Sequence, residues 1–295
     1  MELSALRIFK AVAEEGSVTL AAARLNRVQS NVSARLTQLE ESLGVTLFHR
    51  AGRGLHITAE GERLLAYAER LLQLADEAQA AMRLEQQPSG QLRIGSMETT
   101  AAARLPQVLA AFNRKHPQVD LVLDTGPTDQ LLDSVLRHRL DVALVAAPVT
   151  HPELEQQPVF EEELVLITCP THAPVAVPQD VARRNLLVFR AGCTYRRRLE
   201  AWFAEAGVAP GRIAEFGTFE AIIGCVAAGM GVALMPKEII SQRKLGRTVR
   251  VHALPPAIAH VDTMLVWRKD VLHHRARSAF ADILALAAQR LRAAA

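Results

Sequence analysis

A helix predicted close to the N-terminus has short polar side chains around its apolar stripe. In the stretch RVQSNVSARLTQLE, residues 27–40, Val32, Leu36 and Leu39 recur at helical spacing, and Leu43 continues the stripe. The positions around the stripe hold Gln29, Ser30, Ser33, Ala34, Arg35 and Thr37. Amides and hydroxyls of this kind hydrogen-bond base edges or phosphates, and their small size lets another surface come close. This face predicts contact with nucleic acid.

Positive charge gathers around the same helix. Residues 24–56 contain five arginines and two acids, although the net charge of the whole chain is only +3. Arg50 and Arg53 belong to this set, and Arg53 stands inside the tripeptide Gly52-Arg53-Gly54, which predicts a tight turn. Such a local excess attracts phosphate, so both arginines are candidate DNA contacts.

Three short helices and a hairpin would position these side chains. The segment SALRIFKAVAEEG predicts a first helix that Gly16 stops, and SVTLAAARLN a second that begins at Ser17 as its N-cap. With the polar helix this makes a helix-turn-helix, a motif whose second helix can enter a major groove. The following GVTLFHRAGRGLHIT predicts two strands joined by a turn, which is the wing of a winged domain.

A long helix is expected after Thr58, a candidate N-cap followed by two glutamates in the first turn. Apolar residues spaced four and three apart form a heptad seam in it, and such a seam suits pairing between helices. The seam residues that predict dimerisation are Leu64, Ala68, Leu71, Ala75 and Met82. Pro88 and Gly90 end the helix and mark a linker.

Strands alternate with helices in the rest of the chain, from QLRIGS to the last predicted helix at residues 273–292. This order predicts βαβ units, a parallel sheet and two α/β lobes with a cleft between them. The chain of 295 residues is long enough for several cores, with 49% hydrophobic and 22% charged residues. We expect a DNA-binding domain at 1–58, a linker helix at 59–88, one lobe at 89–165 with 262–295, and a second lobe at 166–261.

The loops that follow the strands of a parallel sheet should line the cleft, where helix N-termini supply free N–H groups. The candidate binding residues on these loops are Ser96, Glu98, Thr99, Thr100, Thr128, Thr194, Tyr195, Phe219 and Glu220. Each hydroxyl and each carboxylate can equally be a helix cap. Glu98 and Glu220 facing one cleft would repel an anion and pair with an amine, which Tyr195 and Phe219 could cover, so an amine is the expected ligand.

Several classes of protein are disfavoured by the sequence. Residues 1–16 lack the basic and apolar regions of a secretion signal, and no later run approaches the length of a membrane span, so we expect a cytoplasmic protein. Cys169, Cys193 and Cys225 form no C-x-x-C pair and predict buried thiols instead of a disulfide or a metal site. The segment GMGVAL lacks the third glycine of a dinucleotide fingerprint and precedes a strand, and G-x-S-x-G and H-E-x-x-H are absent from the sequence. We expect no enzyme and no cofactor. A redox sensor using Cys193 and Cys225, and a cytosolic solute-binding protein, stay open as alternatives.

The stretch LRIFKAVAEEGSVTLAAARLNRVQSNVSARLTQLEESLGVTLFHRAGRGLHITAEG resembles the N-terminal module of the LysR-type transcriptional regulators, and the layout of the whole chain is similar to theirs. The resemblance implies a winged helix-turn-helix, a long helix that pairs two subunits, and a two-lobed effector domain like a periplasmic binding protein. It implies homotetramers built as dimers of dimers, promoter operator DNA and a small-molecule effector as partners, and RNA polymerase as a further candidate partner.

Carried over by position, the resemblance places four residues of the polar helix at bases and phosphates and Arg53 in the minor groove. The four are Gln29, Ser30, Ser33 and Ala34. Family members often have Ser where this chain has Val28 and Arg where it has Ala34, so the operator sequence does not carry over.

Overall fold

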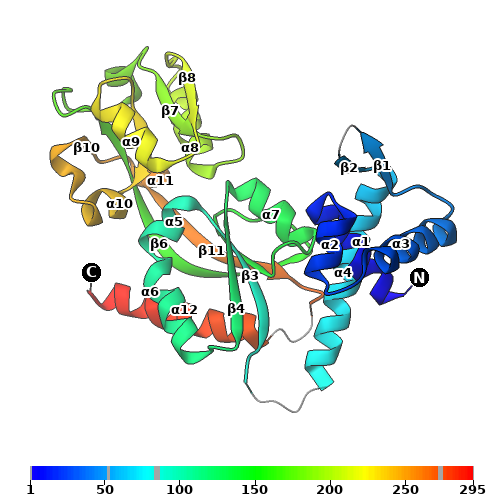
Figure 1. The fold of residues 1–295 in the computed structure, drawn as a ribbon. Coiled ribbons are helices and arrows are strands. Elements are labelled where there is room, and N and C mark those ends of the chain that lie inside the picture. Colours follow the sequence, from blue (N-terminus) through cyan, green and yellow to red (C-terminus); the bar gives the residue numbers. More distant parts are fainter. Residues whose placement is uncertain (1, 52–53, 83–86, 272–274, 295) are drawn as a thin grey trace. The chain divides into compact units, whose positions relative to one another are not determined.

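The computed structural model describes residues 2–51, 54–82, 87–271 and 275–294 and divides the chain into two compact units, Met1–Glu85 and Gln86–Ala295 (Figure 1). Within these ranges, none of the helices combines the length and the apolar character that crossing a bilayer requires. The boundaries predicted for the two lobes of the second unit, near residues 165 and 262, stay predictions.

The first unit contains the helices α1 (Leu3–Glu15), α2 (Val18–Arg24) and α3 (Gln29–Leu43), the strands β1 (Phe48–Ala51) and β2 (Gly54–Ile57), and the long helix α4 (Ala59–Met82). Leu6, Phe9 and Val12 of α1 are buried in its core. The expected caps are present: Gly16 ends α1 with a left-handed backbone (φ +59°), and the Ser17 hydroxyl accepts a hydrogen bond from the Leu20 N–H.

The apolar stripe of α3 is shorter than its spacing predicts. Val32, Leu36 and Leu39 are buried, whereas Leu43 is exposed. Leu43 is the last residue of the helix before the left-handed Gly44, so the chain turns away before this side chain reaches the core.

Two side chains fix the hairpin and the start of α4. The Glu40 carboxylate accepts hydrogen bonds from the N–H groups of Leu47 (2.6 Å) and Phe48 (3.4 Å), which ties the base of the hairpin to α3. The Thr58 hydroxyl donates to the Thr46 carbonyl (2.8 Å) and accepts from the Gly61 N–H (3.0 Å). Thr58 therefore caps α4, as the sequence indicates.

The second unit has a first group of strands in which β3 (Gly90–Ser96) pairs in parallel with β4 (Val119–Thr125) and β5 (Val142–Ala146). The strand β11 (His260–Arg268) lies antiparallel between β5 and the first part of β6 (Leu154–Thr168). The helices of this lobe are α5 (Glu98–Ala103), α6 (Leu105–Lys115), α7 (Thr128–Leu136) and α12 (Arg275–Ala294). Phe112 of α6 meets Phe280 of α12 edge to face in the core, with ring centroids 5.8 Å apart.

The last part of β6 continues into the second lobe, as Figure 1 shows, and pairs antiparallel with β9 (Ala233–Pro236) and β10 (Arg250–His252). The strands β7 (Leu186–Phe189) and β8 (Ile213–Phe216) are parallel, and a bridge from Leu186 to Val232 links them to the neighbourhood of β9. The helices are α8 (Thr194–Glu205), α9 (Phe219–Ala227), α10 (Lys237–Gln242) and α11 (Pro256–Ala259), with 3-10 turns at Pro178–Val181 and Leu245–Arg247.

The prediction of parallel sheets is wrong in one respect, because β6 and β11 run antiparallel to their neighbours and make the main sheet mixed. The run ELVLITCP in the sequence predicts a strand that begins only at Glu163, whereas β6 begins at Leu154. Polar residues such as Gln156 and Gln157 fill this first part of the strand, so it lacks the apolar run that marks a buried strand.

Candidate nucleic-acid interface and ligand pocket

The polar face of α3 is exposed, while Val32, Leu36 and Leu39 of its apolar stripe are buried. The exposed residues include every predicted contact on this helix: Gln29, Ser30, Ser33, Ala34, Arg35 and Thr37. The helix begins after Val28, whose side chain makes no capping hydrogen bond, so the positive end of the helix dipole is open to a phosphate. Arg35 already has an acidic partner, since its guanidinium lies 3.4 Å from the Glu2 carboxylate.

The hairpin adds one exposed cation to the described part of this unit. Arg50 is exposed on β1, where it pairs in register with Leu55 of β2. Arg53, predicted at the tip, lies outside the described residues. A wing with an exposed arginine beside a polar helix is suited to phosphate contact.

The helix α4 buries part of its predicted seam within its own unit. Ala68 is fully buried with Leu72 in the core that contains α1, Leu64 and Ala75 are half-buried, and the side chain of Met82 lies outside what the structure describes. Ala68 is therefore wrong as an exposed pairing position, because α1 packs on this side of α4. The exposed apolar stripe is instead Tyr67 (62% exposed), Leu71 (37%) and Leu74 (62%).

A pocket of about 230 Å³ lies in the second unit, where strand ends meet helix starts. It is lined from the β3–α5, β4–α7, β7–α8 and β8–α9 junctions. The lining residues are Met97, Glu98, Thr99, Thr125, Gly126, Pro127, Thr128, Gln130, Phe189, Arg190, Cys193, Tyr195, Phe216, Gly217 and Thr218. The loops that the sequence singled out thus surround one cavity.

The individual side chains divide into those that line the pocket and those that do not. Glu98, Thr99, Thr128 and Tyr195 line it. Ser96, Thr100 and Thr194 are buried but absent from the lining, and the Thr194 hydroxyl donates to the hydroxyl of Thr128 at 3.4 Å.

Phe219 and Glu220 do not have the places predicted for them. Phe219 is buried in the core of the second lobe with Ile222, where it cannot cover a ligand. Glu220 is exposed, and its carboxylate lies 3.7 Å from the Arg243 guanidinium. The expectation of two carboxylates in one cleft therefore reduces to one, Glu98.

Glu98 is half-buried at the start of α5, and its carboxylate accepts a hydrogen bond from the Phe219 N–H at 3.2 Å. Burial, followed by the charge of Glu220, raises the pKa of Glu98 to about 7, although the hydrogen bond from Phe219 acts in the opposite direction. Glu98 can therefore change its charge near neutral pH.

Arg190 is a pocket residue that sequence reasoning missed. It follows β7 directly, and its guanidinium lies beside Gly217, where a Cβ atom would stand 3.5 Å from it. Among the described residues it has no side-chain hydrogen bond or ion pair. Its place at the end of a buried strand was the only signal in the sequence.

Tyr195 and Cys193 bring buried polar atoms to the pocket. The Tyr195 side chain is 2% exposed, and no hydrogen bond of acceptable geometry joins its hydroxyl to the neighbouring Thr99 or to any other described residue. Burial raises the pKa of the Cys193 thiol, whereas a redox-active thiol needs a lowered pKa. Cys193 thus lacks the lowered pKa that the redox alternative requires, and the part of Cys225 in that alternative stays a prediction.

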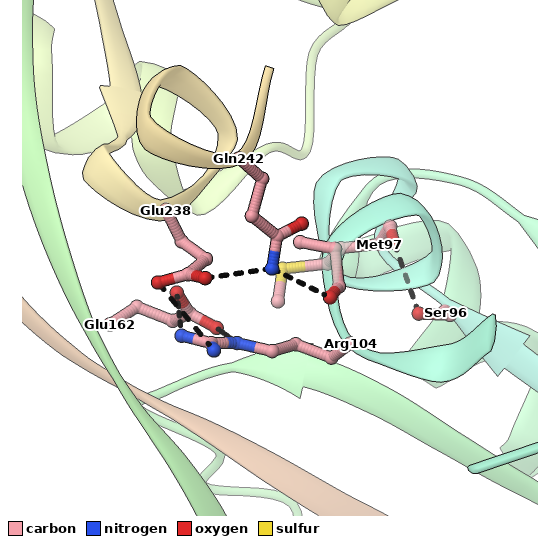
Figure 2. A network of polar contacts seen from close by, with 7 residues as sticks. Ser96, Met97, Arg104, Glu162, Glu238 and Gln242 are labelled. Atoms are coloured by element: carbon pink, nitrogen blue, oxygen red, sulfur yellow. Dashed lines mark hydrogen bonds and ion pairs between the residues drawn. The ribbon is translucent and has the colours of Figure 1, made fainter. Parts of the chain in front are cut away.

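A buried ion pair joins the two lobes next to α5. Figure 2 shows the Arg104 guanidinium against Glu162 of β6 (3.3 Å) and Glu238 of α10 (3.7 Å). The Arg104 and Glu162 side chains are 10% and 5% exposed. The Gln242 amide donates to the Glu238 carboxylate (2.7 Å) and to the Ala103 carbonyl (3.3 Å), which connects α10 with the end of α5.

A unit with an exposed helix-turn-helix and a separate two-lobed unit with a pocket together define a ligand-responsive DNA-binding protein. Residues 3–62 match the bacterial regulatory helix-turn-helix proteins of the lysR family, and residues 85–289 match the LysR substrate binding domain. The chain belongs to the LysR family of transcriptional regulators. Its first unit is a DNA-binding domain and its second an effector-binding domain; it is a regulator and not an enzyme.

Similar proteins cover nearly the whole chain. It is 45% identical over 280 residues to the HTH-type transcriptional regulator GltR of Bacillus subtilis (strain 168), with 95% of each chain covered. It is 44% identical to the regulator YofA of the same organism, covering 96% of this chain and 98% of YofA. Its fold is similar to that of full-length CbnR complexed with target DNA, with a TM-score of 0.69 at 24% identity over 97% of this chain and 100% of that one.

Proposed function

We propose that this regulator reads operator DNA through the exposed face of α3 and the wing. The contacts are Gln29, Ser30, Ser33, Ala34, Arg35 and Thr37 from the helix, with Arg50 and Arg53 from the wing. The observation that supports this most is that all six proposed contact residues of α3 are exposed while Val32, Leu36 and Leu39 are buried. The short side chains allow the helix backbone to approach a major groove.

Self-association through α4 is the second part of the proposal. Tyr67, Leu71 and Leu74 form an apolar stripe that would otherwise face water. Pairing two copies along it buries the stripe and presents two α3 helices to a two-part operator. The proposal also includes the assembly of two such dimers into a tetramer, a cytoplasmic location, and contact with RNA polymerase.

The third part is a small-molecule effector, carrying an amine, that binds the pocket of the second unit and controls transcription. Glu98 supports this assignment, because it is the carboxylate among the described lining residues and would pair with an ammonium group. A ligand that contacts both lobes favours one arrangement of them over others, as regulation requires.

A matched pair of charge insertions tests the DNA contact. Ala34→Glu places a carboxylate on the exposed face of α3, and Ala110→Glu places the same group on an exposed position of α6. A genomic fragment selected by the parent protein serves as probe, at several salt concentrations. We expect Ala34→Glu to weaken binding at least tenfold through repulsion from phosphate, and Ala110→Glu to bind like the parent. Equal affinity of the two variants would overturn the assignment of α3.

A further inference from the structure

The pocket is lined by one acid and one base among the described residues, and they come from different lobes. Glu98 is contributed by α5 and Arg190 by the loop after β7. Two other acids near these junctions are already paired: Glu220 lies 3.7 Å from Arg243, and Asp129 lies 2.8 Å from Arg197. Glu98 and Arg190 therefore decide which charges a ligand can carry.

Arg190 lines the pocket and is available to a ligand, unlike two arginines of the neighbouring helix α8. Arg196 pairs with Glu200 and Glu215, and Arg197 pairs with Asp129. Within the described ranges the Arg190 side chain makes no such contact, and it lies beside Gly217, which has no side chain to shield it. Guanidinium groups match the planar geometry of a carboxylate with two parallel hydrogen bonds, as they also match phosphates.

Further features of the pocket also favour a carboxylate. The helices α7, α8 and α9 begin at the pocket, and the positive ends of their dipoles attract negative charge. The Tyr195 hydroxyl is buried next to Thr99 and makes no well-aligned hydrogen bond to any described residue, so it needs an acceptor, which a ligand can supply. A carboxylate oxygen meets this need.

The walls and volume limit the rest of the ligand. Met97, Phe189 and Phe216 give the pocket apolar surface. At about 230 Å³ it is smaller than the pockets of roughly 300–1,000 Å³ that hold drug-sized molecules. A compact metabolite with a short carbon chain fits these limits.

We propose that the effector is a zwitterionic amino acid whose ammonium group pairs with Glu98 and whose carboxylate pairs with Arg190. This inference rests on the proposed role of the pocket and narrows the amine proposed above. A diamine would put its second ammonium beside Arg190, and a dicarboxylate would put a carboxylate beside Glu98. Only a molecule with one charge of each sign matches both lobes.

Calorimetry on the full chain tests the ligand class. The probes are the twenty standard L-amino acids and short ω-amino acids, each one that binds being compared with its decarboxylated amine and its deaminated acid; for leucine these are 3-methylbutylamine and 4-methylpentanoate. We expect one or more amino acids to bind at least tenfold more tightly than both counterparts. The class is overturned if no amino acid binds at millimolar concentration, or if either counterpart binds equally well.

Two variants test the assigned contacts. Arg190→Gln should weaken binding of the amino acid at least tenfold and leave binding of its amine counterpart unchanged. Glu98→Gln should weaken binding of the amino acid and leave binding of its acid counterpart unchanged. Arg184→Gln, an exposed arginine of the same lobe outside the pocket lining, is the control and should bind like the parent. Unaltered amino acid affinity in Arg190→Gln would overturn the assignment.

The outcomes separate this inference from the function on which it rests. Tight binding of a dicarboxylate or a diamine overturns the proposal that the ligand is an amino acid, but it is consistent with the pocket being an effector site. If no small molecule of a broad metabolite panel binds while the protein still binds DNA, the proposed effector control fails as well.

Discussion

The Glu98 carboxylate accepts a hydrogen bond from the backbone N–H of Phe219, at 3.2 Å, so the first residue of α5 holds the first residue of α9. The two residues are 121 positions apart in the chain and belong to different lobes. Arg197 of α8 makes a second connection, with its guanidinium 3.0 and 2.8 Å from the two carboxylate oxygens of Asp129 of α7. The lobes are thus joined by charged groups directly at the pocket.

The stability of the second unit should depend on pH through Glu98. Its pKa of about 7 in the folded chain lies above the ordinary 4.5, so the folded state binds this proton more tightly than the unfolded state. The stabilisation of the folded state by this bound proton is complete below pH 4.5 and is lost as the pH rises through about 7. We expect Glu98→Gln to melt at a higher temperature than the parent above pH 7, and the gap to close near pH 4.5. Melting curves across this range, with exposed Glu205→Gln as control, check the prediction; a gap that is constant with pH contradicts it.

Removing the buried cation of the inter-lobe network should be strongly destabilising. Arg104→Met leaves the Glu162 carboxylate buried without its partner, which costs about 3–5 kcal/mol of the free energy of unfolding. Arg137→Met removes an exposed partner of Asp133 and should cost less than about 1 kcal/mol. The free energies of unfolding of the two variants are compared by urea unfolding, followed by the fluorescence of Trp202 and Trp267, which both belong to the second unit.

A double variant distinguishes an unpaired charge from lost packing in the same network. Arg104→Met combined with Glu162→Leu removes both charges and should recover a large part of the lost stability. A double variant as unstable as Arg104→Met alone would show that the shape of Arg104, including its contact with the Phe160 ring at 5.6 Å, matters more than its charge.

A charge on the exposed stripe of α4 should prevent self-association. Leu71→Glu puts a carboxylate between Tyr67 and Leu74, and burying it in a paired interface costs several kcal/mol. Ala66→Glu places the same group on an exposed position away from that stripe. Sedimentation equilibrium should show a smaller assembly for Leu71→Glu only. If both variants keep the mass of the parent, the stripe is not the pairing surface.

The wing arginine should contribute to affinity without contributing to sequence preference. Arg50→Ala removes one phosphate contact, so binding should weaken similarly on all sequences and the salt dependence should fall by about one ion. Arg63→Ala removes a cation of α4 that already pairs with Glu60 at 2.9 Å and serves as control. The affinity of each protein for DNA is measured over a series of salt concentrations. Equal slopes of log affinity against log salt for Arg50→Ala and the parent would contradict a phosphate contact.

Local signals in the sequence were sufficient for the helix-turn-helix, the wing and the long helix, and for the loops of the pocket. Caps such as Ser17 and Thr58 and stops such as Gly16 act within a few residues, so they are readable without a structure. The spacing of apolar residues in α4 was compatible with two different packing partners, for a physical reason. Packing on its own domain and pairing with a second copy both need an apolar seam, and Ala68 proved to serve the first.

The pocket charges were harder to predict, because they depend on which way neighbouring side chains turn. Successive residues of a helix point about 100° apart, so with Phe219 in the core Glu220 faces solvent and Arg243. This reasoning was available from the sequence and would have removed Glu220 from the cleft. Arg190 was not predictable in this way, since an isolated arginine after a strand reads as a surface residue until the folded chain places Gly217 beside it.

The position of β11 between β5 and β6 has a consequence for biosynthesis. The ribosome delivers β3, β4, β5 and β6 well before residues 260–268, while β7 to β10 occupy the intervening stretch of chain. The first lobe therefore emerges with a gap in the middle of its sheet, and the second can gather its strands before that gap is filled. Long-range pairing of this kind is slow. The residues of the first unit, Met1–Glu85, are thus all synthesised before β11 is available to complete the main sheet of the second unit.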